Sequence, residues 1–284
     1  DRYLNEGLAM GQAFNAVDYK LADGLRYRYE VENCVKEMAG QDVKGKLKTA
    51  GVDKIVSIKV KEKDSGNKIA VLYAEGEIRD DDSSSPFSAD EQVISEEMAN
   101  KLRKLKDDDD VKAVVFRVNS PGGSAYISEQ IWKEVVELKA KKPIVVSMGN
   151  YAASGGYYIS CAANKIVAER TTLTGSIGVF GVVRNFTGTF DKVGVTTDIV
   201  KTNTFADLGD ISRPMREDEK ALIQRGVEQT YDLFLTRCAD GRGMTKAEID
   251  SIGQGRVWTG EQALERGLVD QLGGMDDAIK EAAT

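Results

Sequence analysis

Short apolar runs alternate with longer amphipathic segments over most of the chain. Val111–Val118 is rich in β-branched residues, as expected for a strand buried in a parallel sheet. Residues 124–140 are predicted to form a helix, and residues 143–148 a second strand. This alternation predicts an α/β fold in which helices cover a parallel sheet.

The same pattern predicts further elements on both sides of this unit. A long amphipathic helix is expected at 217–237, with Leu222, Val227 and Tyr231 among its apolar positions. The other expected elements are strands at 55–60, 69–74 and 165–168, helices at 90–105 and 153–163, and a polar, serine-rich loop at 80–89.

A weak internal repeat connects the two ends of the chain. Ala16–Asp23 parallels Ala263–Asp270, and Val31–Glu37 parallels Met275–Glu281. Two short amphipathic helices can show such similarity by chance. Order and spacing nevertheless agree within a three-residue gap, which favours a true duplication.

The repeat predicts how the chain is divided. Residues 1–45 are expected to be the helical tail of a preceding copy, and residues 46–54 a polar linker. Residues 55–284 are then a complete second copy. Since the chain begins at Asp1 without a signal peptide, we expect it to be part of something longer.

Composition narrows the classes of function. The net charge is -7 and the pI is about 5.0, and this acidic balance argues against binding to nucleic acid. No run of about 18 apolar residues is present, so no transmembrane span is predicted in the chain.

The three cysteines do not have metal-ligand spacing, and the chain has no histidine, so neither a metal nor a cofactor is expected. Cys161 is interpreted as a small core residue. The sequence leaves open whether Cys34 and Cys238 form a disulfide.

Two glycine-rich turns follow predicted strands. They are Asn119–Ser124 and Ala152–Gly156, and loops at the carboxyl ends of parallel strands share one edge of a sheet. Each turn leads into a helix, where unpaired N–H groups point outward. The N–H groups of Gly123 and Gly155 can therefore form an oxyanion hole beside Ser154, in which loss of one donor typically costs about 3 kcal/mol.

Ser154 is the candidate nucleophile, and without histidine its activating base must be another group, with lysine the main alternative. The structural alternative is that Ser154 is a helix N-cap, since glycine pairs before helices are common in α/β proteins. A hydroxyl of Thr174 or Ser176 in the small-residue loop Thr174–Gly181 can hold a lysine amine, although a structural role in the turn explains these residues more simply. Ser124, Ser147 and Ser160 are further candidate hydroxyls. Neither turn has Walker spacing, which argues against nucleotide binding.

Together these segments resemble the signal peptide peptidase A, or protease IV, family. The matching segments are Phe116–Gly123, Val145–Ser160, Leu173–Val179, Ser212–Met215, Arg256–Gly260 and Gly267–Gly273. The similarity covers about residues 68–284. It implies a Clp protease/crotonase-like fold of repeated β-β-α units.

The resemblance also implies a catalytic assignment. Ser154 is expected to be the nucleophile of a Ser/Lys dyad, with Gly123 and Gly155 as oxyanion donors. Short members of the family carry the lysine at a position that aligns with Ala206, which has no amine. Long members are tandem duplications in which the first half supplies the lysine and the second half the serine. Lys201 is the nearest substitute within this chain.

The leading hypothesis is therefore a serine endopeptidase of which this chain is the C-terminal, serine-bearing half. The resemblance implies remnant signal peptides as substrates, homo-oligomers, and a location at the bacterial inner membrane with the catalytic domain on the periplasmic side. The membrane segment is expected outside this chain. The alternatives are a crotonase-like enzyme acting on an acyl thioester and a non-catalytic scaffold.

Overall fold

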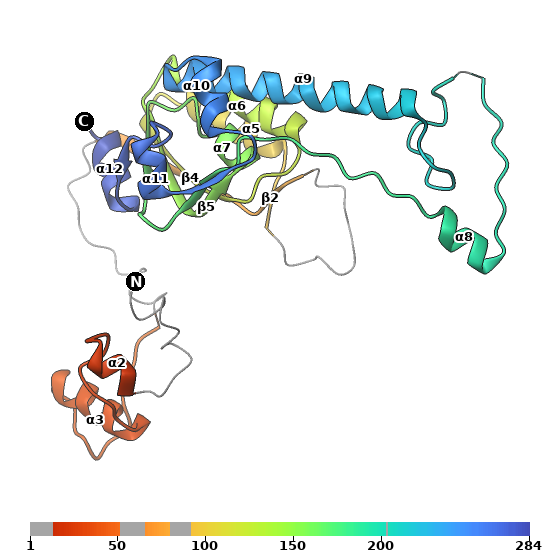
Figure 1. Cartoon of the computed structure of the whole chain (residues 1–284). Coiled ribbons are helices and arrows are strands. Elements are labelled where there is room, and N and C mark those ends of the chain that lie inside the picture. Colours follow the sequence, from red (N-terminus) through yellow and green to blue (C-terminus); the bar gives the residue numbers. More distant parts are fainter. Residues whose placement is uncertain (1–13, 52–65, 80–91, 203) are drawn as a thin grey trace. The chain divides into compact units, whose positions relative to one another are not determined.

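The computed structural model describes residues 14–51, 66–79, 92–202 and 204–284 (Figure 1). The chain divides into two compact units, residues 1–63 and 64–284. The strand predicted at 55–60 and the loop predicted at 80–89 lie outside the described residues.

The first unit contains two helices, α2 (Phe14–Asp18) and α3 (Arg28–Met38). Its apolar side chains are largely unburied within the unit. Met38 is 84% exposed, and the other exposed large apolar side chains described in this unit are Leu21, Leu25, Tyr27, Tyr29, Val31, Val35 and Val43. A unit of about this size has at best a marginal core of its own.

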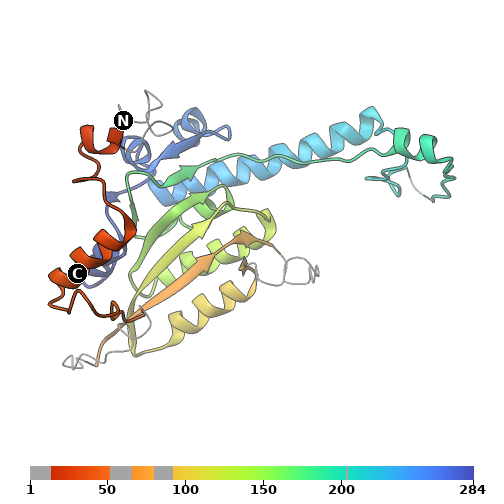
Figure 2. The same cartoon turned by 90° about the horizontal axis from the view of Figure 1, so that it is seen from below.

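The second unit is built on a seven-stranded sheet, and its mostly parallel arrangement covered by helices is the one predicted. The main strand order is β1 (Lys68–Glu75), β4 (Val111–Ser120), β5 (Ile144–Ala153), β6 (Lys165–Ala168) and β9 (Gln271–Leu272). The short strand β7 (Leu173–Gly175) pairs with the end of β5 on one side and with β8 (Val257–Thr259) on the other. Every pairing in this sheet is parallel except β7–β8 (Figure 2). A separate parallel pair joins β2 (Glu77–Ile78) to β3 (Val93–Ile94).

Helices cover both faces of the sheet. The main core includes side chains of α5 (Glu97–Asp107), α6 (Ala125–Lys139), α7 (Gly155–Tyr158) and α9 (Glu217–Arg242). On the other face, Ala278 and Ala282 of α12 (Met275–Ala282) pack with the strand residues Ala113, Val115, Val145 and Val167. The helices α10 (Lys246–Ile252) and α11 (Gly260–Glu265) complete the C-terminal region.

The long helix α9 has two different halves. Phe234, Leu235, Cys238 and Ala239 in its C-terminal half are buried in the core. Its N-terminal end projects from the sheet toward α8 (Thr187–Val193) (Figure 1). We call residues 180–202 and 204–216 the arm. Its exposed apolar side chains include Phe180, Val182, Val193 and Val200.

Three predicted boundaries differ from the structure. Residues 90–105 do not form one helix, because β3 precedes α5. The strand predicted at 143–148 continues to Ala153, since residues 151–153 pair with β7. The helix predicted at 153–163 is the single turn α7, which ends before the short connection into β6.

The cysteines are free thiols, so the Cys34–Cys238 disulfide left open by the sequence is not present. Cys34 is exposed in the first unit, whereas Cys161 and Cys238 are both fully buried in the core of the second. Burial and the neighbouring Cys161 raise the pKa of the Cys238 thiol. The interpretation of Cys161 as a core residue is confirmed.

Candidate active site

Ser154 lies at the junction between β5 and α7 in a strained backbone conformation. Its φ and ψ are 52° and -120°, a region that residues with a side chain rarely adopt. Such a position costs on the order of 1–3 kcal/mol and is often found at active sites. The hydroxyl makes no capping hydrogen bond to α7, so the alternative that the Ser154 side chain serves as a helix N-cap is wrong. The N–H of Ser154 donates to the carbonyl of Gly175 at 2.9 Å.

The two glycine turns face each other, as their predicted position at one sheet edge requires. A Cβ placed on Gly122 would lie 2.6 Å from the nitrogen of Gly155 and 2.8 Å from Cβ of Ser154. The φ of Gly122 is 101°. A side chain at this position would therefore collide with the turn that carries the serine.

Hydrogen bonds to Ile78 fix the first turn. The Ile78 N–H donates to the Gly122 carbonyl at 2.8 Å, and the Ser124 N–H donates to the Ile78 carbonyl at 2.7 Å. Gly123 lies between them with φ 144°, and a Cβ there would be 2.0 Å from the Ile78 carbonyl oxygen. Within the described part of the chain, the N–H groups of Gly123 and Gly155 have no hydrogen-bond acceptor.

Ser154 opens onto a cleft of about 920 Å³. Glycines 122, 123 and 155 line it together with Ser176. Apolar and aromatic lining comes from Val179, Phe180, Val227, Tyr158, Tyr231 and Phe234. The charged residues among the described lining are two carboxylates, Glu77 and Glu228, and no described lysine lines the cleft.

A partly buried polar cluster supports the wall of the cleft at Tyr158. The Tyr158 hydroxyl donates to Glu129 at 2.6 Å, and Arg237 pairs with the same carboxylate at 2.5 Å. The Arg237 guanidinium lies 4.0 Å from the ring centre of Trp132, within the range of a cation–π interaction. Burial and Glu129 raise the pKa of Tyr158. Its hydroxyl therefore stays protonated and cannot serve as a base near neutral pH.

The other candidate hydroxyls have structural partners. Ser124 caps α6, Ser160 Oγ donates to the Gly156 carbonyl at 2.7 Å, and Thr174 Oγ1 donates to the Ala152 carbonyl at 2.7 Å. Ser147 Oγ accepts from Arg117 at 2.9 Å. Ser176 differs, because it lines the cleft with φ 49° and no hydrogen bond of its hydroxyl is found among the described residues.

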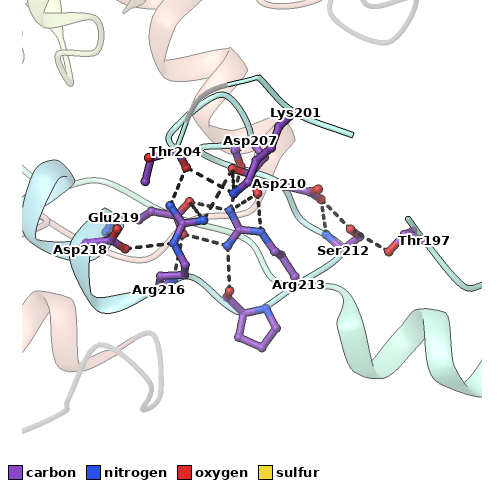
Figure 3. A network of polar contacts seen from close by, with 11 residues as sticks. Thr197, Lys201, Thr204, Asp207, Asp210, Ser212, Arg213, Arg216, Asp218 and Glu219 are labelled. Atoms are coloured by element: carbon purple, nitrogen blue, oxygen red, sulfur yellow. Dashed lines mark hydrogen bonds and ion pairs between the residues drawn. The ribbon is translucent and has the colours of Figure 1, made fainter. Parts of the chain in front are cut away.

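Lys201 is engaged in the arm and does not line the Ser154 cleft (Figure 3). Its Nζ lies 2.9 Å from Oδ1 of Asp207, whose other carboxylate oxygen is 2.7 Å from Arg213. Hydrogen bonds from Lys201 and Arg213 lower the pKa of Asp207. This ion pair holds the Lys201 side chain in the arm and not in the lining of the Ser154 cleft. Ala206 immediately precedes Asp207 in the same loop.

Sequence reasoning missed three residues of the cleft. Tyr231 was counted only as an apolar position of its helix, and neither Glu228 nor Gln254 carried a signal. Gln254 has φ 57°, and its N–H donates to the Tyr231 hydroxyl at 2.9 Å. That hydroxyl donates to Asp250 at 2.7 Å. Burial and Asp250 raise the pKa of Tyr231 to about 12.

Comparison with known proteins finds related folds and families. The family model "Clp protease" matches residues 87–177, and the fold is α/β with a mostly parallel sheet, which confirms the predicted fold class. Among solved structures, a ClpP1 mutant from Listeria monocytogenes aligns with a TM-score of 0.48 and 14% identity, over 74% of this chain and 94% of that chain.

The model "Peptidase family S49" matches residues 136–284. A putative signal peptide peptidase SppA from Enterococcus faecium is 39% identical over 81% of this chain and 67% of its own length. This chain belongs to peptidase family S49, so the resemblance predicted from the motifs is confirmed.

Longer relatives match as well. Protease 4 of Salmonella typhi is 41% identical over 94% of this chain, and the chloroplastic serine protease SPPA of Arabidopsis thaliana is 36% identical over 98% of it. The chain spans 42% and 41% of the lengths of these two relatives.

Proposed function

We propose that this chain is the serine-bearing half of a serine endopeptidase of the Ser/Lys dyad type. The observation that carries the proposal is the strained, half-buried Ser154, which lines one cleft with Gly123 and Gly155, two residues whose N–H groups have no acceptor among the described residues. The neutral amine of a lysine takes the Ser154 proton, and the alkoxide attacks a peptide carbonyl, while the N–H groups of Gly123 and Gly155 bind the oxyanion. The C–N bond then breaks, and the lysine ammonium returns its proton to the leaving amine. Water, deprotonated by the same lysine, hydrolyses the acyl-enzyme and restores Ser154.

The lysine is proposed to come from a preceding half of the complete protein. In support, the described lining of the cleft contains no lysine, and Lys201 is paired with Asp207. The Ser176 hydroxyl faces the same cleft and is suited to hold an incoming amine. The dry cleft would lower the pKa of that amine toward neutrality.

Matching backbone geometry at the two ends supports the duplication. At the end of α2, N–H groups at positions 20, 21 and 22 donate to carbonyls at 17, 16 and 16. At the end of α11, N–H groups at 267, 268 and 269 donate to carbonyls at 264, 263 and 263. Lys20 and Gly267, which align in the repeat, both have positive φ, 57° and 71°. Lysine is an unusual residue for that conformation, so the shared geometry extends beyond the similarity of sequence.

The apolar surface of α3 gives this preceding half a place to pack. In α12 the small residues Ala278 and Ala282 are buried against the sheet. The repeat aligns Ala278 with Cys34, and one residue beyond its end Ala282 corresponds to Met38; both α3 residues are exposed. We infer that a sheet of the preceding copy covers this side of α3 in the complete protein.

The substrate is proposed to be an extended, apolar peptide such as a signal peptide remnant, with small residues near the cut. Aromatic and aliphatic side chains line much of the cleft. Residues 178–185 leave the cleft without backbone hydrogen bonds to other described residues. An extended peptide can add to such a segment through main-chain hydrogen bonds.

The proposed setting is the periplasmic side of the bacterial inner membrane, in a homo-oligomer. The exposed apolar side chains of the arm are the surface available for contact between copies. None of the helices in the described ranges is long and apolar enough to cross a bilayer, and the anchor is proposed to lie elsewhere in the complete protein.

Substitution of the nucleophile tests the proposal in the complete protein. Ser154→Ala should abolish peptide hydrolysis and labelling by a fluorophosphonate, since only an activated serine reacts with that probe. Lys201→Ala is the matched comparison, and it should keep most of both activities because Lys201 pairs with Asp207 in the arm. If the two substitutions inactivate the protein equally, the proposal that the catalytic lysine comes from a preceding half is wrong. If Ser154→Ala is still labelled, the assignment of Ser154 as the nucleophile is wrong.

A further inference from the structure

Three strained backbone positions meet at the Ser154 cleft. Among the described residues of the second unit, the non-glycine residues with positive φ are Ser154 at 52°, Ser176 at 49° and Gln254 at 57°. All three line the cleft. Conformations of this kind persist only where the surrounding contacts hold them in place.

Backbone hydrogen bonds join these positions into one assembly. A carbonyl of the segment 175–177 accepts a hydrogen bond from the N–H of Ser154 at 2.9 Å. Two further backbone hydrogen bonds, of 2.7 and 2.8 Å, join the same segment to the loop 253–256. A displacement of this loop is therefore passed to the segment that carries Ser176 and supports Ser154.

Tyr231 of α9 ties the loop to the rest of the molecule. Its hydroxyl donates to Asp250 at 2.7 Å and accepts the N–H of Gln254 at 2.9 Å. A Cβ on Gly253 would lie 3.0 Å from the Tyr231 hydroxyl oxygen and 3.3 Å from the Ile177 carbonyl oxygen. Glycine at this position therefore allows the loop, the tyrosine and the segment 175–177 to approach one another closely.

We propose that Tyr231 is a positioning residue for the reaction of Ser154. The tyrosine holds Gln254 in its left-handed conformation, and the loop 253–256 then holds the segment 175–177. This inference rests on the proposed function, because it concerns the rate of the serine step. The Arg256 side chain also bonds the loop, to the Ser251 and Gly253 carbonyls, so loss of the tyrosine hydroxyl should loosen the loop without unfolding it.

The first test measures steady-state kinetics in the complete protein. Tyr231→Phe removes both hydrogen bonds and keeps the ring in the cleft wall. We expect kcat to fall about tenfold while KM changes less than about twofold, because small misplacement of reacting groups slows the chemical step. Tyr126→Phe is the matched control and should leave both constants unchanged, since Tyr126 is 64% exposed and does not line the cleft.

The second test measures amide hydrogen exchange, which does not depend on activity. In Tyr231→Phe the amides of 175–177 and 253–256 should exchange faster, whereas those of β4 should not change. Normal exchange in both segments, or an increase in KM with kcat unchanged, would overturn the inference.

The two proposals fail differently. If Ser154→Ala is inactive and Tyr231→Phe keeps full kcat, only the positioning role is wrong. If Ser154→Ala is active, the proposed function itself is wrong.

Discussion

The two ends of α9 are held by different forces. Near its C-terminal half the cleft is shaped by close backbone contact and positive φ at Ser154, and its described lining carries no cation. Near its N-terminal end Asp207 and Glu219 are paired with Arg213 and other cations in the arm (Figure 3). The cleft should therefore be sensitive to added volume, and the arm to protonation.

Added volume at the oxyanion turn should have the largest effect. In Gly123→Ala the new Cβ would meet the Ile78 carbonyl oxygen at 2.0 Å, at a φ of 144°. We expect hydrolysis by the complete protein to fall more than about a hundredfold, since loss of one oxyanion donor alone costs about that much. Thermal denaturation should also show a loss of stability of about 1–3 kcal/mol from overpacking.

Gly188→Ala in α8 is the matched control in the arm. Among the described residues, no atom beyond its own helix backbone and chain neighbours lies within 4 Å of a Cβ at that position. This variant should keep its activity and stability. Similar losses in the two variants would show that the cleft is not more tightly constrained than the arm.

Local signals explain why much of the cleft could be predicted. Ser154, Gly123 and Gly155 lie in two short turns, and parallel strands bring such turns to one edge whatever the details of packing. Tyr231 could not be assigned, because its partners Asp250 and Gln254 are 19 and 23 residues away. From its position in the predicted helix, Tyr231 could be assigned only to the apolar face, and the partners of its hydroxyl could not be predicted.

The same reasoning explains errors in the elements. Val111–Val118 could be predicted as a strand because its nearly continuous burial requires a nearly continuous apolar run. In contrast, β7, β8 and β9 have three residues or fewer, which is too short to show a periodic pattern. The sequence did not show that Lys201 pairs with Asp207 six residues later. Ion pairs across an irregular loop depend on the folded path of the chain.

Protonation should loosen the arm before the cleft. Arg213 holds the pKa of Glu219 at about 2, and Lys201 and Arg213 lower that of Asp207. Because these folded-state pKa values are lowered, the stabilisation is present above the unfolded values near 4 and is lost as pH falls toward 2. Amide exchange in 204–219, corrected for intrinsic rates, should rise from pH 5 to pH 2.5 while β4 and β5 stay protected.

Removing one carboxylate should reproduce this effect at neutral pH. Asp207→Asn is expected to speed exchange in 204–219 at pH 7 and to change hydrolysis less than about threefold, because the arm network lies outside the cleft lining. Asp191→Asn in α8 makes the same change where no described side chain pairs with the carboxylate, and should have no effect. Equal protection in Asp207→Asn and the unsubstituted protein would show that charge does not hold the arm.

The charge of the cleft lining should have the smallest effect, on substrate preference. Glu228 accepts a hydrogen bond from Gln224 at 3.0 Å and faces a cleft with no described cation. Peptides matched except for one lysine or glutamate should therefore be cleaved at different rates, with lysine favoured about two- to fivefold, the range expected for an exposed ion pair.

Charge reversal makes that preference testable on one helix. Glu228→Lys should invert the lysine-to-glutamate ratio of kcat/KM, and the inversion should shrink in high salt because the charges are exposed. Asp240→Lys makes the same charge change at an exposed position of α9 outside the cleft lining, and should leave the ratio as it was. An equal shift in both variants would assign the preference to net charge and not to the cleft. The contrast between the two ends of α9 would then concern backbone strain alone.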